Sequence, residues 1–173
     1  MPNLQPRISA FQEIRDIPYR IALTPEEQDY SCATKPKMLA EKLSALGLES
    51  RRILCEFRWH SLGIPAEVLR YAKSHTDTHE YLEVLIPESG EWVTVDPSWD
   101  ARLKNAGLTI SDWDGEHATA IGVTPIKTYS VDESACLIAA EESGDPDVRK
   151  KYLADNKEFF SALNAWLESK RKK

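Results

Sequence analysis

The sequence contains few cysteines and no long apolar run. Its 173 residues include three widely spaced cysteines and no CxxC pair. This pattern excludes a disulfide framework and favours reduced thiols. No stretch approaches the roughly 18 apolar residues of a membrane-spanning helix, and no apolar segment follows the first basic residue. We therefore expect a cytoplasmic protein without a membrane partner.

An excess of positive charge is also missing, because 22 basic residues stand against 28 acidic ones for a net charge of −6. Binding to phosphate backbones requires clustered lysine and arginine, so nucleic acid is not an expected partner. The chain has no internal repeat. Apolar residues make up 42% of it, enough for the core of one domain. We expect a single domain over residues 1–173.

Two amphipathic patterns predict helices in the first third of the chain. The first has apolar residues at spacings of three and ends at Pro18; its members are Ile8, Phe11, Ile14 and Ile17. The second ends at Gly47 and consists of Met38, Leu39, Leu43 and Leu46. Cys32 lies at or just before the start of this second helix. Because Pro36 crowds the carbonyl of Cys32 in a regular helix, we expect helical geometry to begin near Thr34 or Lys35.

Further elements are predicted along the rest of the chain. Residues 52–59 read as a strand, 64–72 as one or two helical turns, and 118–123 as another strand. Asp145 as N-cap and Pro146 at the first helical position open a C-terminal helix over residues 145–170.

A β-hairpin is the clearest local feature. The runs 79–86 and 91–96 flank the turn formers of residues 87–90. With the turn centred on Glu88 and Ser89, paired residue numbers sum to 177. Tyr81 then faces Asp96, and His79 is the diagonal neighbour of Asp96 on the same face. Such diagonal positions lie about 7–8 Å apart, a gap that an imidazole and a carboxylate can close with one hydrogen bond.

The same alternation separates a polar face from an apolar one. Core contacts are expected on the apolar face, which carries Leu82, Val84, Ile86, Val93 and Val95. On the polar face, a carboxylate bound to one ring nitrogen of His79 fixes the tautomer and leaves the other nitrogen for a nucleophile. Cys32 is the candidate nucleophile, because free N–H groups and the helix dipole lower a thiol pKa and can bind an oxyanion.

These three segments resemble the core of the transglutaminase-like superfamily. The similarity covers about residues 28–100 and rests on three elements: the helix from Cys32 to the Leu46-Gly47 pair, the strand opened by His79, and the Val95-Asp96-Pro97 motif. The resemblance implies an α+β, papain-like fold with the cysteine helix packed on an antiparallel sheet. It assigns Cys32 as nucleophile, His79 as base and acid, and Asp96 as the residue that orients the histidine.

The resemblance also implies a function. It predicts a cysteine hydrolase or acyltransferase that cleaves or transfers amide and peptide bonds through a thioester, acting on a peptide or protein amide and using water or an amine as acceptor. No cofactor and no metal is expected. The sequence leaves hydrolysis, transamidation and deamidation open. A non-catalytic binding module on the same fold is the alternative.

Five residues are candidates for substrate binding. The oxyanion donor is left open among Gln28, which is close to Cys32 in sequence, Tyr30 and a tryptophan. Tyr81, Trp99 and Trp113 are either walls of an acyl-donor groove or ordinary core residues. The other cysteines, Cys55 and Cys136, are expected in the core. A zinc site formed by Cys32, His75 and His79 is disfavoured, because the His-x-x-x-His spacing precedes a strand and does not lie on a helix.

Overall fold

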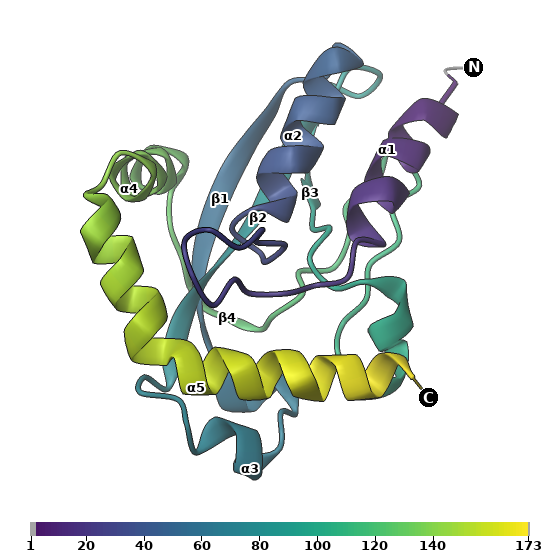
Figure 1. Ribbon diagram of the computed structural model, residues 1–173. Coiled ribbons are helices and arrows are strands. Elements are labelled where there is room, and N and C mark those ends of the chain that lie inside the picture. The colour runs from purple at the N-terminus through teal and green to yellow at the C-terminus, as the bar shows by residue number, and fades with distance from the viewer. Residues whose placement is uncertain (1–2, 173) are drawn as a thin grey trace.

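The computed structural model describes residues 3–172, and a four-stranded antiparallel sheet forms its centre (Figure 1). The strand order is β3-β2-β1-β4. The strands are β1 (Ser50–Arg58), β2 (Thr76–Ile86), β3 (Glu91–Val95) and β4 (Pro125–Thr128). Helices pack around this sheet, which confirms the predicted α+β class.

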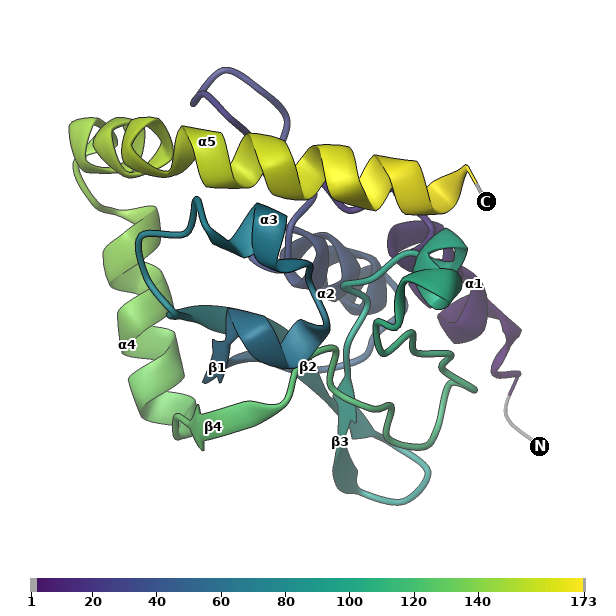
Figure 2. The same ribbon diagram turned by 90° about the horizontal axis from the view of Figure 1, so that it is seen from below.

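Both faces of the sheet are covered by helices (Figures 1 and 2). The helices are α1 (Gln5–Arg15), α2 (Lys35–Ala45), α3 (Ala66–Leu69), α4 (Val131–Glu142) and α5 (Pro146–Arg171). Two short 3-10 helices, η1 (Trp59–Leu62) and η2 (Ala101–Ala106), complete the described elements. Helices α1 and α2 pack on one face, and α3 and α5 pack against residues of the other.

Each face therefore has its own hydrophobic cluster. The cluster under α1 and α2 includes Leu82, Val84 and Val95, as the alternation predicted. The second cluster joins β1 and α5 and includes Tyr81, which shares a face of β2 with His79. The prediction of a polar face was incomplete, because α5 covers that side too and His79 is only 1% exposed.

The hairpin and the N-terminal helices confirm the sequence predictions. Strands β2 and β3 pair Glu83 with Thr94 and Leu85 with Trp92, which is the predicted register. Helix α2 begins at Lys35 with Thr34 as N-cap, so Cys32 lies in the turn ahead of it. Helix α5 begins at Pro146, and the Asp145 side chain accepts a hydrogen bond from the next free amide.

Two segments after residue 100 differ from the predictions. Residues 118–123 form no strand, because their polar groups bind other partners: the Thr119 amide donates to the Thr94 carbonyl at 2.8 Å. Strand β4 follows instead and pairs with β1. Helix α4 was not predicted, although Ser130 and Glu133 form the capping box that starts it.

The cysteines divide into three environments. Cys55 is buried in β1, as predicted. The prediction for Cys136 was wrong, because it is exposed. Helix α4 buries Ser134 and Ile138, four residues apart, and the residue between them points to the opposite side. Cys32 is half-buried.

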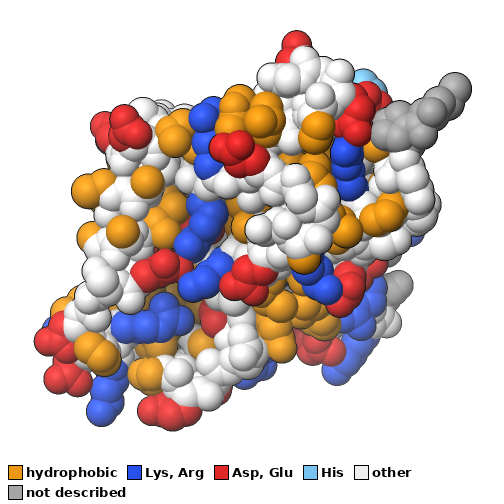
Figure 3. All heavy atoms as spheres, turned by 90° about the horizontal axis from the view of Figure 1, so that it is seen from above, with side chains coloured by type: hydrophobic (Ala, Val, Ile, Leu, Met, Phe, Trp, Pro, Cys, Tyr) orange, Lys and Arg blue, Asp and Glu red, His pale blue; other side chains and the backbone are white. Residues whose placement is uncertain are grey.

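The surface is mixed in character. In the view of Figure 3, basic and acidic side chains are interspersed with apolar ones, without a broad patch of one charge. Within residues 3–172, no helix combines the length and apolarity that crossing a membrane requires.

Candidate functional site

The turn that carries Cys32 is organised by a buried carboxylate. Asp29 accepts hydrogen bonds from the Ala22 amide at 2.9 Å, from the Ser31 amide at 3.1 Å and from the Thr34 hydroxyl at 2.7 Å. The Lys35 amide then bonds to the Ser31 carbonyl at 3.0 Å, which leads into α2. Cys32 thus lies in a turn that is held by the Asp29 carboxylate and by the first main-chain bond leading into α2.

His79 and Asp96 form a buried pair. The Nε2 atom of His79 lies 2.7 Å from Oδ2 of Asp96, and both side chains are 1% exposed. Because the register places these residues diagonally across β2 and the end of β3, the hairpin alone brings them together. Nδ1 is the ring nitrogen that remains for another partner.

The Asp96 carboxylate is held by two main-chain amides as well. The Gly122 amide donates to Oδ2 at 2.7 Å and the Ser98 amide to Oδ1 at 2.9 Å. Burial raises the pKa of Asp96, but the charge and hydrogen bond of His79, together with these amides, outweigh burial and lower it. The carboxylate is therefore ionised and fixed in orientation.

Opposite effects act on the histidine. Burial lowers the pKa of His79, yet the Asp96 charge and hydrogen bond raise it above its ordinary value, and interaction with the Cys32 side chain raises it further. The imidazolium form is thus stabilised mainly by the Asp96 carboxylate and further by the Cys32 side chain. The structure brings Cys32, His79 and Asp96 to one place from three segments of the chain.

Tyr19 is a neighbour of Cys32 that the sequence did not reveal. Its hydroxyl lies 3.9 Å from Cys32 Sγ, and its ring stacks on Trp99 with centroids 4.3 Å apart. Burial, followed by the charges of Cys32 and Asp29, raises the pKa of Tyr19, whereas the Cys32 main-chain amide acts in the opposite direction. The hydroxyl thus keeps its proton beside both the sulfur and the amide of Cys32. No sequence motif marks this residue, since its role depends on the fold of the loop between α1 and α2.

A small cavity of ≈ 100 Å³ adjoins Cys32. Aromatic and apolar walls come from Tyr19, Ile21, Trp59, Tyr152 and Phe160. Polar groups reach it from strand β2 and from α4 and α5, namely Asp77, Thr78, Glu80, Glu141 and Arg149. By the usual measure of about 10–15 Å³ for one water, this space accepts several waters or a short side chain.

None of the five residues predicted to bind substrate lines this cavity. The Gln28 side chain donates to the Asp29 carbonyl at 3.1 Å, and Tyr30 pairs through its backbone with Arg20. Tyr81, Trp99 and Trp113 are all buried. Trp99 contributes indirectly, because its indole N–H binds the Gly122 carbonyl at 2.8 Å next to the amide that holds Asp96.

The three other histidines are exposed; they are His60, His75 and His117. Among residues 3–172, the His, Cys, Asp and Glu side chains form no group of three or more arranged to hold a metal ion. Comparison with family models, with curated proteins and with solved structures gave no match to this chain.

Proposed function

We propose that this chain is a cysteine hydrolase or acyltransferase of the transglutaminase-like type, with a papain-like arrangement of helix and sheet. The observation that supports the proposal most strongly is the buried His79–Asp96 pair beside the half-buried thiol of Cys32. A buried ion pair of this kind next to a thiol at a cavity is the arrangement that activates a cysteine nucleophile.

In the acylation step, the Cys32 thiolate attacks the carbonyl carbon of an amide. The carbon–sulfur bond forms, the carbon–nitrogen bond breaks, and His79 gives its proton to the leaving amine. Asp96 keeps the imidazole oriented throughout, because its carboxylate is fixed by the two amides described above. Water or a second amine then attacks the thioester and returns the proton to His79 and the electron pair to sulfur.

The oxyanion of the tetrahedral intermediate is bound by Tyr19 and the Cys32 amide. The Tyr19 hydroxyl lies 3.9 Å from the Cys32 sulfur, and the phenol remains a hydrogen-bond donor because burial raises its pKa. Fixed hydrogen-bond donors aimed at the developing negative charge are usually the largest single contribution to acyl transfer. Tyr19 thus has the role for which the sequence suggested Gln28, Tyr30 or a tryptophan.

Alkylation with iodoacetamide tests the nucleophile, and the chain contains its own reference thiols. Cys136 is exposed, whereas burial raises the pKa of Cys55 to about 12. At pH 6, where an ordinary thiol is protonated, we expect Cys32 to be modified at least about tenfold faster than Cys136. Mass spectrometry of peptides from a time course measures both rates in one sample.

The variant His79→Ala should remove this advantage, and His75→Ala, which changes an exposed histidine, should keep it. Mixing the protein with p-nitrophenyl acetate should then release p-nitrophenolate and leave an acetyl group on Cys32. Modification of Cys32 no faster than Cys136, unchanged in His79→Ala, would contradict the proposal and favour a binding module on this fold.

A further inference from the structure

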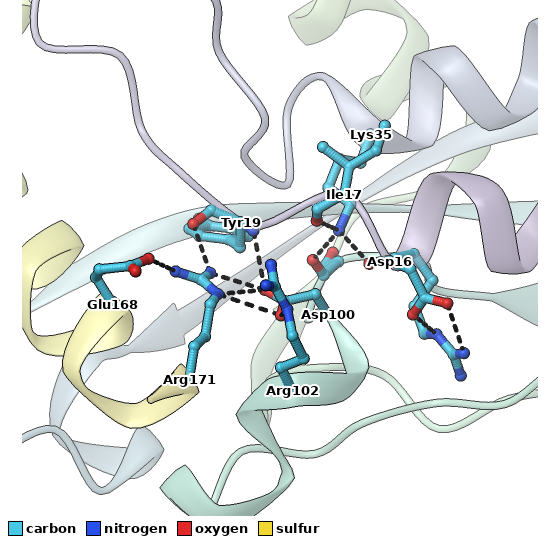
Figure 4. Close-up of polar contacts among 10 residues, drawn as sticks. Asp16, Ile17, Tyr19, Lys35, Asp100, Arg102, Glu168 and Arg171 are labelled. Carbon is cyan, nitrogen blue, oxygen red and sulfur yellow. Dashed lines mark hydrogen bonds and ion pairs between the residues drawn. The ribbon is translucent and has the colours of Figure 1, made fainter. Parts of the chain in front are cut away.

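Lys35 is a buried cation behind the candidate site. Its side chain is 0% exposed, three residues after Cys32 in the first turn of α2. The ammonium group donates to three main-chain carbonyls, those of Ser98 at 2.7 Å, Arg15 at 2.8 Å and Ile17 at 3.0 Å. Figure 4 shows this side chain entering the segment that follows α1. Three carbonyl acceptors match the three N–H groups of the protonated amine, whereas a neutral amine has only two.

These bonds join three parts of the chain. The Arg15 and Ile17 carbonyls lie at the end of α1, and the Ser98 carbonyl lies two residues beyond Asp96. The Ser98 amide in turn donates to the Asp96 carboxylate. One residue thus carries both the hydrogen bond that orients Asp96 and the carbonyl that receives Lys35.

The charges that act on Lys35 come from three parts of the fold. Asp100 and Asp96 follow β3, Asp16 follows α1, and Arg171 lies at the end of α5. Arg171 bonds to Asp100 at 2.7 Å and to the Tyr19 carbonyl at 2.9 Å (Figure 4). Asp16 is half-exposed and paired with Arg15 at 2.8 Å. The buried positive charges of Lys35 and Arg171 thus lie near the negative charges of Asp96 and Asp100, and Asp96 is also paired with His79.

We propose that Lys35 is a positioning residue for the His79–Asp96 pair, which it serves by fixing the segment after Asp96 through the Ser98 carbonyl and by placing a positive charge near the Asp96 carboxylate. Its importance for catalysis rests on the function proposed above. Its effect on the carboxylate does not depend on that function.

The sign of the effect follows from the charges. Burial lowers the pKa of Lys35 to about 7 although Asp100 and Asp96 raise it, so the ammonium form is present in the acid range in which Asp96 takes up a proton. Removal of this positive charge raises the pKa of Asp96. Removal of the negative charge of Asp100 lowers it. A loss of packing alone gives no such opposite pair of shifts.

The experiment follows the acid titration of Asp96 by NMR, through its side-chain carboxyl carbon and the ring signals of His79. Lys35→Met should move the midpoint to higher pH by about one unit and Asp100→Asn should move it to lower pH by a similar amount. Lys37→Met is the matched control, because Lys37 lies on the same helix but is exposed and paired with Glu142 at 3.1 Å. It should leave the midpoint unchanged. Urea unfolding establishes that each variant is folded.

If Lys35→Met does not fold, Lys35→Gln replaces it, since the amide keeps two donors and lacks the charge. Shifts in the same direction for Lys35 and Asp100 variants, or no shift in folded protein, would overturn the proposal. Failure of both Lys35 variants to fold would also overturn it, because the lysine would then serve the whole fold. Iodoacetamide rates measured on the same samples report separately on Cys32, so a titration with the expected shifts and an unreactive Cys32 refutes only the proposed enzyme.

Discussion

The proposed chemistry at Cys32 can be tested at single contacts, and the Tyr19 hydroxyl, 3.9 Å from the sulfur, is the first of them. Tyr19→Phe removes one oxygen and keeps the ring on Trp99. Because the loss of one oxyanion donor usually costs about 10²–10³ in kcat, we expect acylation by p-nitrophenyl acetate to fall by a factor in or near this range. Tyr30→Phe is the matched control, since Tyr30 does not line the cavity beside Cys32. Equal rates in wild type and Tyr19→Phe would exclude Tyr19 as a donor.

Gly122 has no room for a side chain. A Cβ atom at this position would lie 2.9 Å from the Trp99 ring and 3.2 Å from Asp96 Oδ2. Gly122→Ala should therefore displace the amide that holds the carboxylate and lower the free energy of unfolding by about 1–3 kcal/mol, as overpacking commonly does. Urea denaturation measures the stability, and slower alkylation of Cys32 should accompany the loss. A Gly122→Ala variant with the stability and the Cys32 reactivity of the wild type would contradict this prediction, because the loop around residue 122 would then accommodate the methyl group.

Among the elements, helix α5 contacts the candidate site through a buried charged side chain near its C-terminal end. The Arg171 side chain is 5% exposed and contacts Asp100, the Tyr19 carbonyl and Glu168. Arg171→Met leaves the buried Asp100 without this partner, so we expect a loss of about 3–5 kcal/mol in the free energy of unfolding.

Lys172→Met provides the comparison for this prediction. Lys172 is exposed, and its Nζ atom lies 3.9 Å from Oε1 of Glu168. Its replacement should therefore change the free energy of unfolding by no more than about 1 kcal/mol. Chemical denaturation of both variants at one pH measures the two free energies of unfolding. A similar, small effect for both would mean that α5 is held by its apolar contacts alone.

The elements also show how far the sequence alone could lead. The hairpin was predictable down to its register, because alternation and a short turn are local properties, and the register brought His79 to Asp96. The prediction of a strand over residues 118–123 was wrong. The composition of this segment suits a strand, but two of its amides bind Asp96 and the Thr94 carbonyl. Tyr19 and Lys35 were missed for a related reason: their roles depend on tertiary contacts with Cys32 and Ser98 that no local pattern contains.

For the whole molecule, two buried groups give opposite dependences of stability on pH. The folded-state pKa of His79 is raised to about 10, so its stabilising contribution is complete below its unfolded pKa, about 6.5, and is lost as pH rises toward 10. The folded-state pKa of Lys35 is lowered to about 7, so stability increases from that pH toward its unfolded value, about 10.4. The two trends oppose each other between about pH 7 and about pH 10.

Urea unfolding across this interval should therefore give a shallow profile for the wild type. Lys35→Met keeps only the contribution of His79 and should lose stability as pH rises, whereas His79→Gln keeps only that of Lys35 and should gain stability. Lys37→Met should follow the wild type. Parallel profiles for the two buried-site variants would contradict this assignment.

The contact between Arg171 and the Tyr19 carbonyl has a further consequence for synthesis. These residues are separated by 152 positions, and the bond fixes the segment that places the phenol beside Cys32. On the ribosome, the hairpin and the cysteine helix emerge long before residue 171 does. The nascent chain thus carries its thiol without the final restraint on Tyr19, and the site is completed only after translation has passed the end of α5.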